Sequence, residues 1–427
     1  MRATLWLLAL FGTAVAVALF AGNNQGTITV FWPPYRVDFS LNMVLLLLVG
    51  GFVTVYAALR ALATLVALPQ RAHHWRVQQK ERDMHRALLD ALTHMQGGRF
   101  LRARKSALAA LAQEEALRNA DAAVPHGEQL RTLAHMVAAE GSHALQDRST
   151  RETHLQQALA HAPAGGTSQQ QELREGAQMR AARWLLDDRD ANAALEQLAA
   201  LPQGAARRTL ALRIKLKASK LDQRTTEALE TARLLTKHRA FSEAAAQSII
   251  RGLASDLIQG AHDITQLRKV WAELESTERS MPELAIRAAQ RLAELGGEAR
   301  NVRDWLTPVW ERWLQDPSSL NASQALHLTQ ALESGLDTLD SPWLARIEAA
   351  HQANPRDARL QYLAGVACLQ RQLWGKAQQL LGQAVQQLGD APLRVRAWRH
   401  LATLAEQRGD ATAATAAWKQ AAQALSP

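Results

Sequence analysis

Two long, uncharged apolar runs near the N-terminus restrict what this chain can fold into more than any other feature. Leu5 to Ala21 contains 17 residues, and Leu41 to Leu59 contains 19. At about 1.5 Å per helical residue, each run reaches roughly 25–29 Å, close to the thickness of the hydrocarbon core of a bilayer. Both runs are therefore predicted to be transmembrane helices, and the second is predicted to continue as a helix up to Pro69.

The first run also fits a cleaved signal peptide, with Ala16-Val17-Ala18 as the cleavage motif. We prefer a retained span, because the apolar region of a signal peptide is usually about 7–15 residues long. The segment 22–40 between the two runs alternates polar and apolar residues around Pro33-Pro34. This alternation predicts a short β-hairpin on the outer membrane surface.

The net charge of +9 is concentrated directly after the second run. Residues 71–105 contribute +6, whereas residues 1–70 contribute +2 and residues 106–427 contribute +1. Because positively charged residues flank membrane helices on the cytoplasmic side, the N-terminus and residues 71–427 are predicted to be cytoplasmic. The basic side chains predicted to bind anionic lipid are Arg71, Arg76, Lys80, Arg82 and Arg86. Nucleic acid is a weaker alternative, since the stretch lacks aromatics for base stacking apart from Trp75.

Composition favours an all-α fold for the remainder of the chain. Ala, Leu, Gln, Arg and Glu dominate, while Tyr occurs three times and Phe seven times in 427 residues. This usage is typical of long helical proteins. The single cysteine, Cys368, excludes an intramolecular disulfide framework.

Regularly spaced prolines indicate a helical repeat. Two proline series have spacings of 37–39 residues: Pro125, Pro163 and Pro202, then Pro317, Pro355 and Pro392. Proline is disfavoured inside helices, so this spacing predicts helix pairs of about that length, which bury their apolar faces by stacking into a solenoid. Pro308 and Pro342 are out of phase with both series.

The two C-terminal units, 358–387 and 395–424, fit the tetratricopeptide pattern best. Small residues are expected to let paired helices touch, a glycine to form the turn, and tryptophans to fill the space against neighbouring pairs. The predicted packing residues are Gly365, Ala377, Trp398, Leu401, Ala402, Gly409, Ala414 and Trp418. A weaker unit lies at 87–108, and further helical pairs are expected around 135–158, 178–198 and 284–314. The tryptophans of DWLTPVWERW are expected to fill the core.

These patterns predict three parts. Residues 1–70 form a two-span membrane anchor with the hairpin at 22–40. Residues 71–105 form a basic juxtamembrane helix that leads into the array, and residues 84–427 form the tetratricopeptide-like repeat domain. The fold class is therefore all-α, with two N-terminal transmembrane helices followed by an α-solenoid.

The sequence contains no motif typical of an enzyme. G-x-S-x-G, H-E-x-x-H and G-x-G-x-x-G are absent, and Gly375-Lys376 is followed by Ala377 where a phosphate-binding loop needs Ser or Thr. A non-enzymatic protein without a metal site is predicted. His73 and His74 are adjacent and lie beside Trp75, so they are candidate haem ligands, although polar residues at an interface are the simpler interpretation.

The chain resembles the HemY-type inner-membrane proteins over its whole length. The resemblance rests on the two spans, the loop GTITVFWPPYRVDFSL, the basic segment after the second span and the C-terminal tetratricopeptide pairs. It implies a link to late haem or porphyrin metabolism, in a family without an established catalytic activity or a catalytic motif. The flavin-dependent protoporphyrinogen oxidase of the same name is a different protein, and its dinucleotide fingerprint is missing here.

Three functions are consistent with these features. The leading hypothesis is a scaffold on the cytoplasmic face of a bacterial inner membrane, which binds enzymes of late haem or porphyrin biosynthesis in the repeat groove. The second is direct binding and handover of haem or porphyrin, with His73 and His74 as ligands. The third is a general scaffold for assembly or quality control of envelope proteins.

Overall fold

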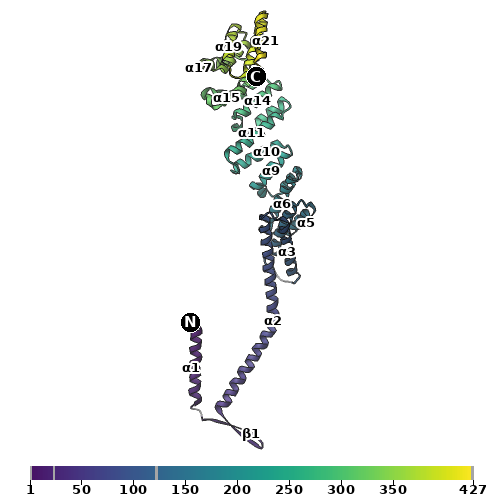
Figure 1. Ribbon diagram of the computed structural model, residues 1–427, viewed down its shortest axis with the longest axis vertical. Helices are drawn as coiled ribbons and strands as arrows, with labels where there is room; N and C mark the ends of the chain where they lie inside the picture. Colours follow the sequence, from purple (N-terminus) through teal and green to yellow (C-terminus); the bar gives the residue numbers. More distant parts are fainter. Residues whose placement is uncertain (1, 23–24, 121–123, 425–427) are drawn as a thin grey trace. The chain divides into compact units, whose positions relative to one another are not determined.

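The structure, a computed structural model, describes residues 2–22, 25–120 and 124–424. The chain divides into two compact units, Met1–Arg174 and Glu175–Pro427. Apart from one short hairpin, the described elements are helices, and Figure 1 shows their order along the chain.

Unit 1 begins with a helix, a hairpin and a long helix. These elements are α1 (Arg2–Gly22), β1 (Thr27–Trp32), β2 (Tyr35–Ser40) and α2 (Leu41–Gln96). The strands pair antiparallel, with Thr27 opposite Ser40 and Trp32 opposite Tyr35, and Pro33-Pro34 in the turn is joined by a cis peptide bond. Ser40 Oγ accepts a hydrogen bond from the Met43 N–H at 3.3 Å, which caps the start of α2.

One helix among the described residues is long and apolar enough to cross a membrane. This is the Leu41–Thr64 part of α2, which has 24 residues, with none of its most apolar window buried. In α1 the corresponding apolar stretch is shorter, Leu8–Leu19. The span in α2 therefore agrees with the sequence, while the span in α1 stays a prediction.

Two prolines lie inside helices, although proline is disfavoured there and was expected to end them. The expected end of the second membrane helix at Pro69 is wrong, because α2 continues through this residue to Gln96. Pro308 also lies inside a helix, α15 (Ala299–Gln315). Around Pro308 the buried side chains of Leu306 and Trp310 hold both halves of the helix in the core. Their burial offsets the cost of about 3 kcal/mol for an interior proline.

The rest of unit 1 consists of closely packed helix pairs. Its helices are α3 (Phe100–Arg118), α4 (Gly127–Ala144) and α5 (Arg148–His161), followed by α6 (Ser168–Asp187), which crosses into unit 2. Helices α2 and α3 pack as a pair, as do α4 and α5, and α3 also packs on α4. Fully buried alanines line these contacts, among them Ala91, Ala107 and Ala138. Alanine allows the helix axes to approach closely, which explains the alanine-rich composition.

Unit 2 continues the same architecture. Its helices are α7 (Ala191–Ala199), α8 (Gln203–Ala206), α9 (Thr209–Leu221), α10 (Thr225–Lys237), α11 (Glu243–Gln259), α12 (Ile264–Glu273), α13 (Ser276–Arg279), α14 (Pro282–Glu294), α15, η1 (Pro317–Ser319), α16 (Ala322–Ser334), α17 (Ser341–Ala353), α18 (Ala358–Gln370), α19 (Trp374–Gln387), α20 (Ala391–Gln407) and α21 (Ala411–Gln423).

The helices of unit 2 form pairs and a continuous layer. Pairs form between α9 and α10, α14 and α15, α18 and α19, and α20 and α21. In addition, α11, α14, α16, α18 and α20 contact one another in that order, so they lie side by side as one layer. The predicted all-α repeat architecture is thereby confirmed. The predicted core role is confirmed for Trp310 and Trp313, which are at most 3% exposed, while Trp305 is partly buried against the same core.

A left-handed residue recurs in the short turns between consecutive helices. Gly98, Gln146, Arg189 and Gln372 have φ between 60° and 67°, and Gly409 has φ 76°. In three turns the next residue is an aspartate whose carboxylate caps the following helix: Asp147, Asp190 and Asp410. The turn and cap together reverse the chain within a few residues.

The close approach of α18 and α19 can be tested at Gly365. A Cβ atom at this position would lie 2.8 Å from Leu381 Cγ and 3.2 Å from the Leu381 backbone nitrogen. We expect Gly365→Ala to lower the free energy of unfolding by roughly 1–3 kcal/mol through overpacking. Gly382→Ala is the matched control, because a Cβ there meets nothing within 4 Å. It should be neutral or stabilising by up to about 1 kcal/mol. Equal effects of the two substitutions in denaturant unfolding of the detergent-solubilised protein would contradict this packing.

Candidate functional site: a polar groove on three stacked helices

The predicted lipid-binding side chains follow the apolar part of α2. Arg76, Lys80, Arg82 and Arg86 are exposed, and Trp75 is 64% exposed. The side chain of Arg71 lies outside the described residues. Exposed basic groups next to a membrane span are suited to anionic headgroups, and lipid binding stays a prediction.

The candidate haem ligands lie on the same helix. His74 is exposed, whereas the side chain of His73 lies outside the described residues. Within the described parts of the chain, no group of three or more His, Cys, Asp and Glu side chains is arranged to hold a metal ion. Haem binding by this pair remains a prediction.

The predicted packing residues divide into buried and exposed positions. Ala377, Ala402 and Ala414 are at most 5% exposed, and Gly409 forms the left-handed turn between α20 and α21. Trp398 and Leu401 are partly buried against the core of unit 2.

Trp418 differs from the expectation that it fills the space against a neighbouring pair. It is 42% exposed, and its indole Nε1 donates to Glu406 Oε1 at 2.7 Å. It lies on α21, the last described helix, so no later helix of the described chain packs on it.

A groove crosses α11, α14 and α16, three neighbours in the layer of unit 2. It has a volume of about 640 Å³ and is called the α11–α14–α16 groove below. Its polar lining includes Arg251, Ser255, Glu283, Arg287, Gln324 and His327. The apolar face of α14 is buried through Leu284, Ala288 and Leu292. Consequently, residues 283, 287 and 290, spaced by four and three, face the groove from the opposite side of the helix.

Glu283 holds the three helices of the groove together. Its Oε1 accepts from Arg251 Nη1 of α11 at 3.3 Å and from Gln324 Nε2 of α16 at 2.8 Å. Arg287 Nη1 donates instead to Ser255 Oγ at 2.5 Å, and Gln290 Nε2 donates to the His327 carbonyl at 3.5 Å. Glu283 is the one carboxylate among the described lining residues, and it is already engaged.

A second polar network closes the layer further along the chain. Glu333 of α16 accepts from Arg396 Nη1 and binds His400 Nε2 of α20, both at 2.9 Å. Burial favours the neutral acid, but the His400 hydrogen bond and the Arg396 charge outweigh it and lower the pKa of Glu333. Burial and the Glu333 charge raise the pKa of Tyr362. The network links α16 to α20 across α18, whose residues 360–368 are all buried.

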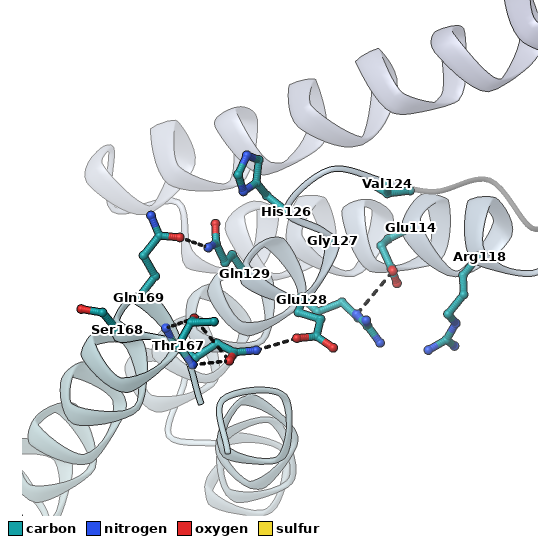
Figure 2. Close-up of a pocket in the computed structure, with 12 residues that line it drawn as sticks. Glu114, Arg118, Val124, His126, Gly127, Glu128, Gln129, Thr167, Ser168 and Gln169 are labelled. Atoms are coloured by element: carbon teal, nitrogen blue, oxygen red, sulfur yellow. Dashed lines mark hydrogen bonds and ion pairs between the residues drawn. The ribbon is translucent and has the colours of Figure 1, made fainter. Parts of the chain in front are cut away.

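Unit 1 contains a polar pocket of about 670 Å³, lined by residues of α3, α4 and segment 167–170. Figure 2 shows that both carboxylates of its lining, Glu114 and Glu128, have partners within the pocket. The Glu114 carboxylate lies 3.3 Å from Arg131 Nε, and Glu128 Oε2 accepts from Gln170 Nε2 at 2.6 Å. Gln129 also donates to Gln169.

Three histidines cluster between α4 and α5, which the sequence analysis did not identify. His135 Nδ1 lies 3.1 Å from His154 Nδ1, and the His135 ring stacks on His161 with centroids 5.8 Å apart. Burial, followed by the nearby histidines and Arg131, lowers the pKa of His135 to about 4. Burial also lowers the pKa of His154 and of His161. The cluster is therefore neutral at pH 7 and stabilises the pair by packing.

Comparison with known proteins finds a family match in the N-terminal region. Residues 26–146 match the family model described as HemY protein N-terminus. This match covers the hairpin, α2, α3 and α4. No curated protein matches the chain.

Several solved helical proteins resemble the chain weakly. The APC/C hetero-tetramer Cut9-Hcn1 gives a TM-score of 0.29 at 13% identity, over 80% of this chain and 66% of that one. Naa15/Naa10 bound to HypK-THB gives 0.25 at 12% identity, over 77% and 56%. The TPR domain of P58(IPK) gives 0.20 at 14% identity, over 80% and 98%. This chain thus spans less than two thirds of the first two structures. Since these scores are low, the fold assignment rests on the helix pairs and the layer described above.

The histidine cluster predicts a loss of stability in acid. The unfolded chain protonates His135 below about pH 6.5, whereas the folded chain does so only near pH 4. The contribution of His135 to the free energy of unfolding is therefore fully present above pH 6.5 and is lost as the pH falls towards 4. The free energy of unfolding should decrease by about 2 kcal/mol between pH 7 and 5 from His135 alone. Hydrogen exchange of α4 and α5, corrected for intrinsic rates, should show this decrease. His135→Leu should reduce it, while His238→Leu, at an exposed site in unit 2, should not. An unchanged pH dependence in His135→Leu would contradict the assignment.

Proposed function

Since residues 26–146 match the family model of the HemY protein N-terminus, we propose that this protein is a membrane-tethered, non-enzymatic scaffold that binds protein partners through its helical array. The observation that carries the proposal is the α11–α14–α16 groove, where polar side chains of three successive helices face one open channel. Stacked helix pairs present extended surfaces of this kind, which are suited to peptides and protein segments.

The groove has the rigidity that recognition of a segment requires. Glu283 connects α11 and α16 through Arg251 and Gln324, and all three helices contribute to the large core of unit 2. A surface held in place before binding loses little conformational entropy when a partner docks. The groove therefore supports a binding function.

The tether and the array share one helix. Helix α2 contains the apolar segment Leu41–Thr64, and its later part packs on α3 as the first helix of the array. We infer that α1 is a second span, so that both the N-terminus and the array lie on the cytoplasmic side of a bacterial inner membrane. The exposed basic side chains after the span support this orientation.

The partners we propose are enzymes of late haem or porphyrin biosynthesis. The support for this choice is the HemY family match, which gives a metabolic context but no partner. A general scaffold for envelope proteins would use the same groove, and the identity of captured partners separates the two functions.

Site-specific photocrosslinking in cells tests the scaffold proposal. A photoreactive residue replacing His327, which is exposed in the groove, should capture a small set of proteins that includes haem-pathway enzymes. The matched control replaces Lys269 of α12, whose side chain is 77% exposed and does not line the groove. Identical adducts from both positions, or none from His327, would refute binding in the groove.

Protease protection of terminal tags tests the topology. With two spans, tags at the N-terminus and the C-terminus should both be protected in intact spheroplasts and digested in inverted membrane vesicles. An N-terminal tag that is digested in spheroplasts, while the C-terminal tag stays protected, would show that α2 alone crosses the membrane.

A further inference from the structure

We propose that the α11–α14–α16 groove recognises a carboxylate in an extended acidic protein segment, with Arg287 as its anchor. This inference rests on the proposed scaffold function and specifies the chemistry of the partner. It follows from the balance of charges and donors in the groove.

The groove has one cationic group that no acid neutralises. Of its two described guanidinium groups, Arg251 faces Glu283 at 3.3 Å. Arg287 instead binds the neutral hydroxyl of Ser255. Arg287 is exposed and has no carboxylate partner among the described residues. A guanidinium has five N–H donors in a fork that matches a carboxylate, so Arg287 retains the capacity for a bidentate interaction.

The position of Arg287 favours an anchoring role. It lies on α14, the central helix of the three, one turn after Glu283. Glu283 is occupied by Arg251 and Gln324, so it braces the groove, and its charge is already compensated. A carboxylate that binds Arg287 therefore contacts an uncompensated cation. The helices on both sides of it are already connected through Glu283.

The other residues that line the groove favour binding of an extended polar segment over binding of an amphipathic helix. The aliphatic side chains of the lining, Leu284 and Ile286, are only 1% and 4% exposed, so they offer little apolar surface. Helix-in-groove recognition depends on such a surface. The side-chain oxygen of Gln290 and the hydroxyl of Ser248 can instead serve a peptide backbone.

The same lining disfavours nucleic acid. No aromatic side chain lies among the described lining residues, so bases would have no stacking platform. One uncompensated guanidinium also provides too little positive charge to follow a phosphate backbone. A protein carboxylate fits both the charge and the shape of the donor set.

Fluorescence anisotropy with the full-length, detergent-solubilised protein tests the inference. The probe is a fluorescein-labelled ten-residue peptide of alternating Glu and Ser, and its control has Gln in place of Glu. The acidic peptide should bind at least tenfold more tightly than the neutral one. Arg287→Gln should weaken the acidic peptide at least fivefold, and Arg287→Lys should weaken it less because the charge remains.

The matched control variant is Arg300→Gln. Arg300 lies on α15 outside the groove, and its side chain is 78% exposed, so the variant removes the same charge elsewhere. It should bind the acidic peptide as the unaltered protein does. Equal losses in Arg287→Gln and Arg300→Gln would reveal a general charge effect and overturn the inference, as would equal binding of both peptides. Far-UV circular dichroism confirms that each variant is folded.

Photocrosslinking distinguishes failure of this inference from failure of the scaffold function. Adducts at position 327 that persist undiminished in Arg287→Gln would show a protein-binding groove that does not use the carboxylate anchor. That result would overturn the inference and leave the scaffold function intact. Loss of these adducts in Arg287→Gln, with retention in Arg300→Gln, would support both.

Discussion

The structure depends on the close contact of helix backbones across small residues. Gly365 leaves no room for a methyl group against Leu381, and fully buried alanines such as Ala107 and Ala384 occupy comparable positions elsewhere. With small residues at the contacts, each pair becomes a thin unit whose remaining apolar face is satisfied only by the next pair. The large core of unit 2 arises from this stacking. Its tryptophans Trp310 and Trp343 fill the wider spaces between pairs.

The same packing produces the groove. When α14 buries Leu284, Ala288 and Leu292 against its neighbours, its opposite face lies outside this apolar contact and faces the groove. Residues at that face are free to be polar, and in α11, α14 and α16 they form a connected network around Glu283. Further along, Glu333 closes the layer over α18 by binding Arg396 and His400 of α20. Polar residues on one layer therefore have two roles, since one set bridges helices and the other stays open to solvent.

Much of the fold was predictable because its signals are local. Apolar length identified the span in α2, and the spacing of small residues and prolines identified the pairs α18–α19 and α20–α21. The turn at Gln146-Asp147 was not predicted, because it contains no glycine and uses a left-handed glutamine followed by an aspartate cap. Pro308 was expected to interrupt a helix but lies inside α15, because the burial of side chains on both sides of it outweighs its local preference.

The candidate site was less accessible to sequence analysis for a different reason. Arg251, Glu283 and Gln324 are separated by 32 and 41 residues in the chain, and only the stacking of three helices brings them together. A spacing of about one repeat between polar residues would be a weak signal for such contacts, because solvent-exposed faces have the same composition. His135 and His154 show the same difficulty, because they come together only when α4 packs on α5.

The continuity of α2 has a consequence for how such a scaffold works. The apolar segment ends at Thr64, and Val77 is already packed against the core formed by Met84, Leu117 and Leu130. The 12 residues between Thr64 and Val77 are helical, so Val77 lies about 20 Å along the helix from Thr64 at the usual helical rise. A glycine- or serine-rich linker of this length would allow the array to sample many orientations. A helical connection restricts that freedom, so a partner bound in the array is held near the membrane with less loss of entropy when it meets a membrane-bound enzyme or substrate.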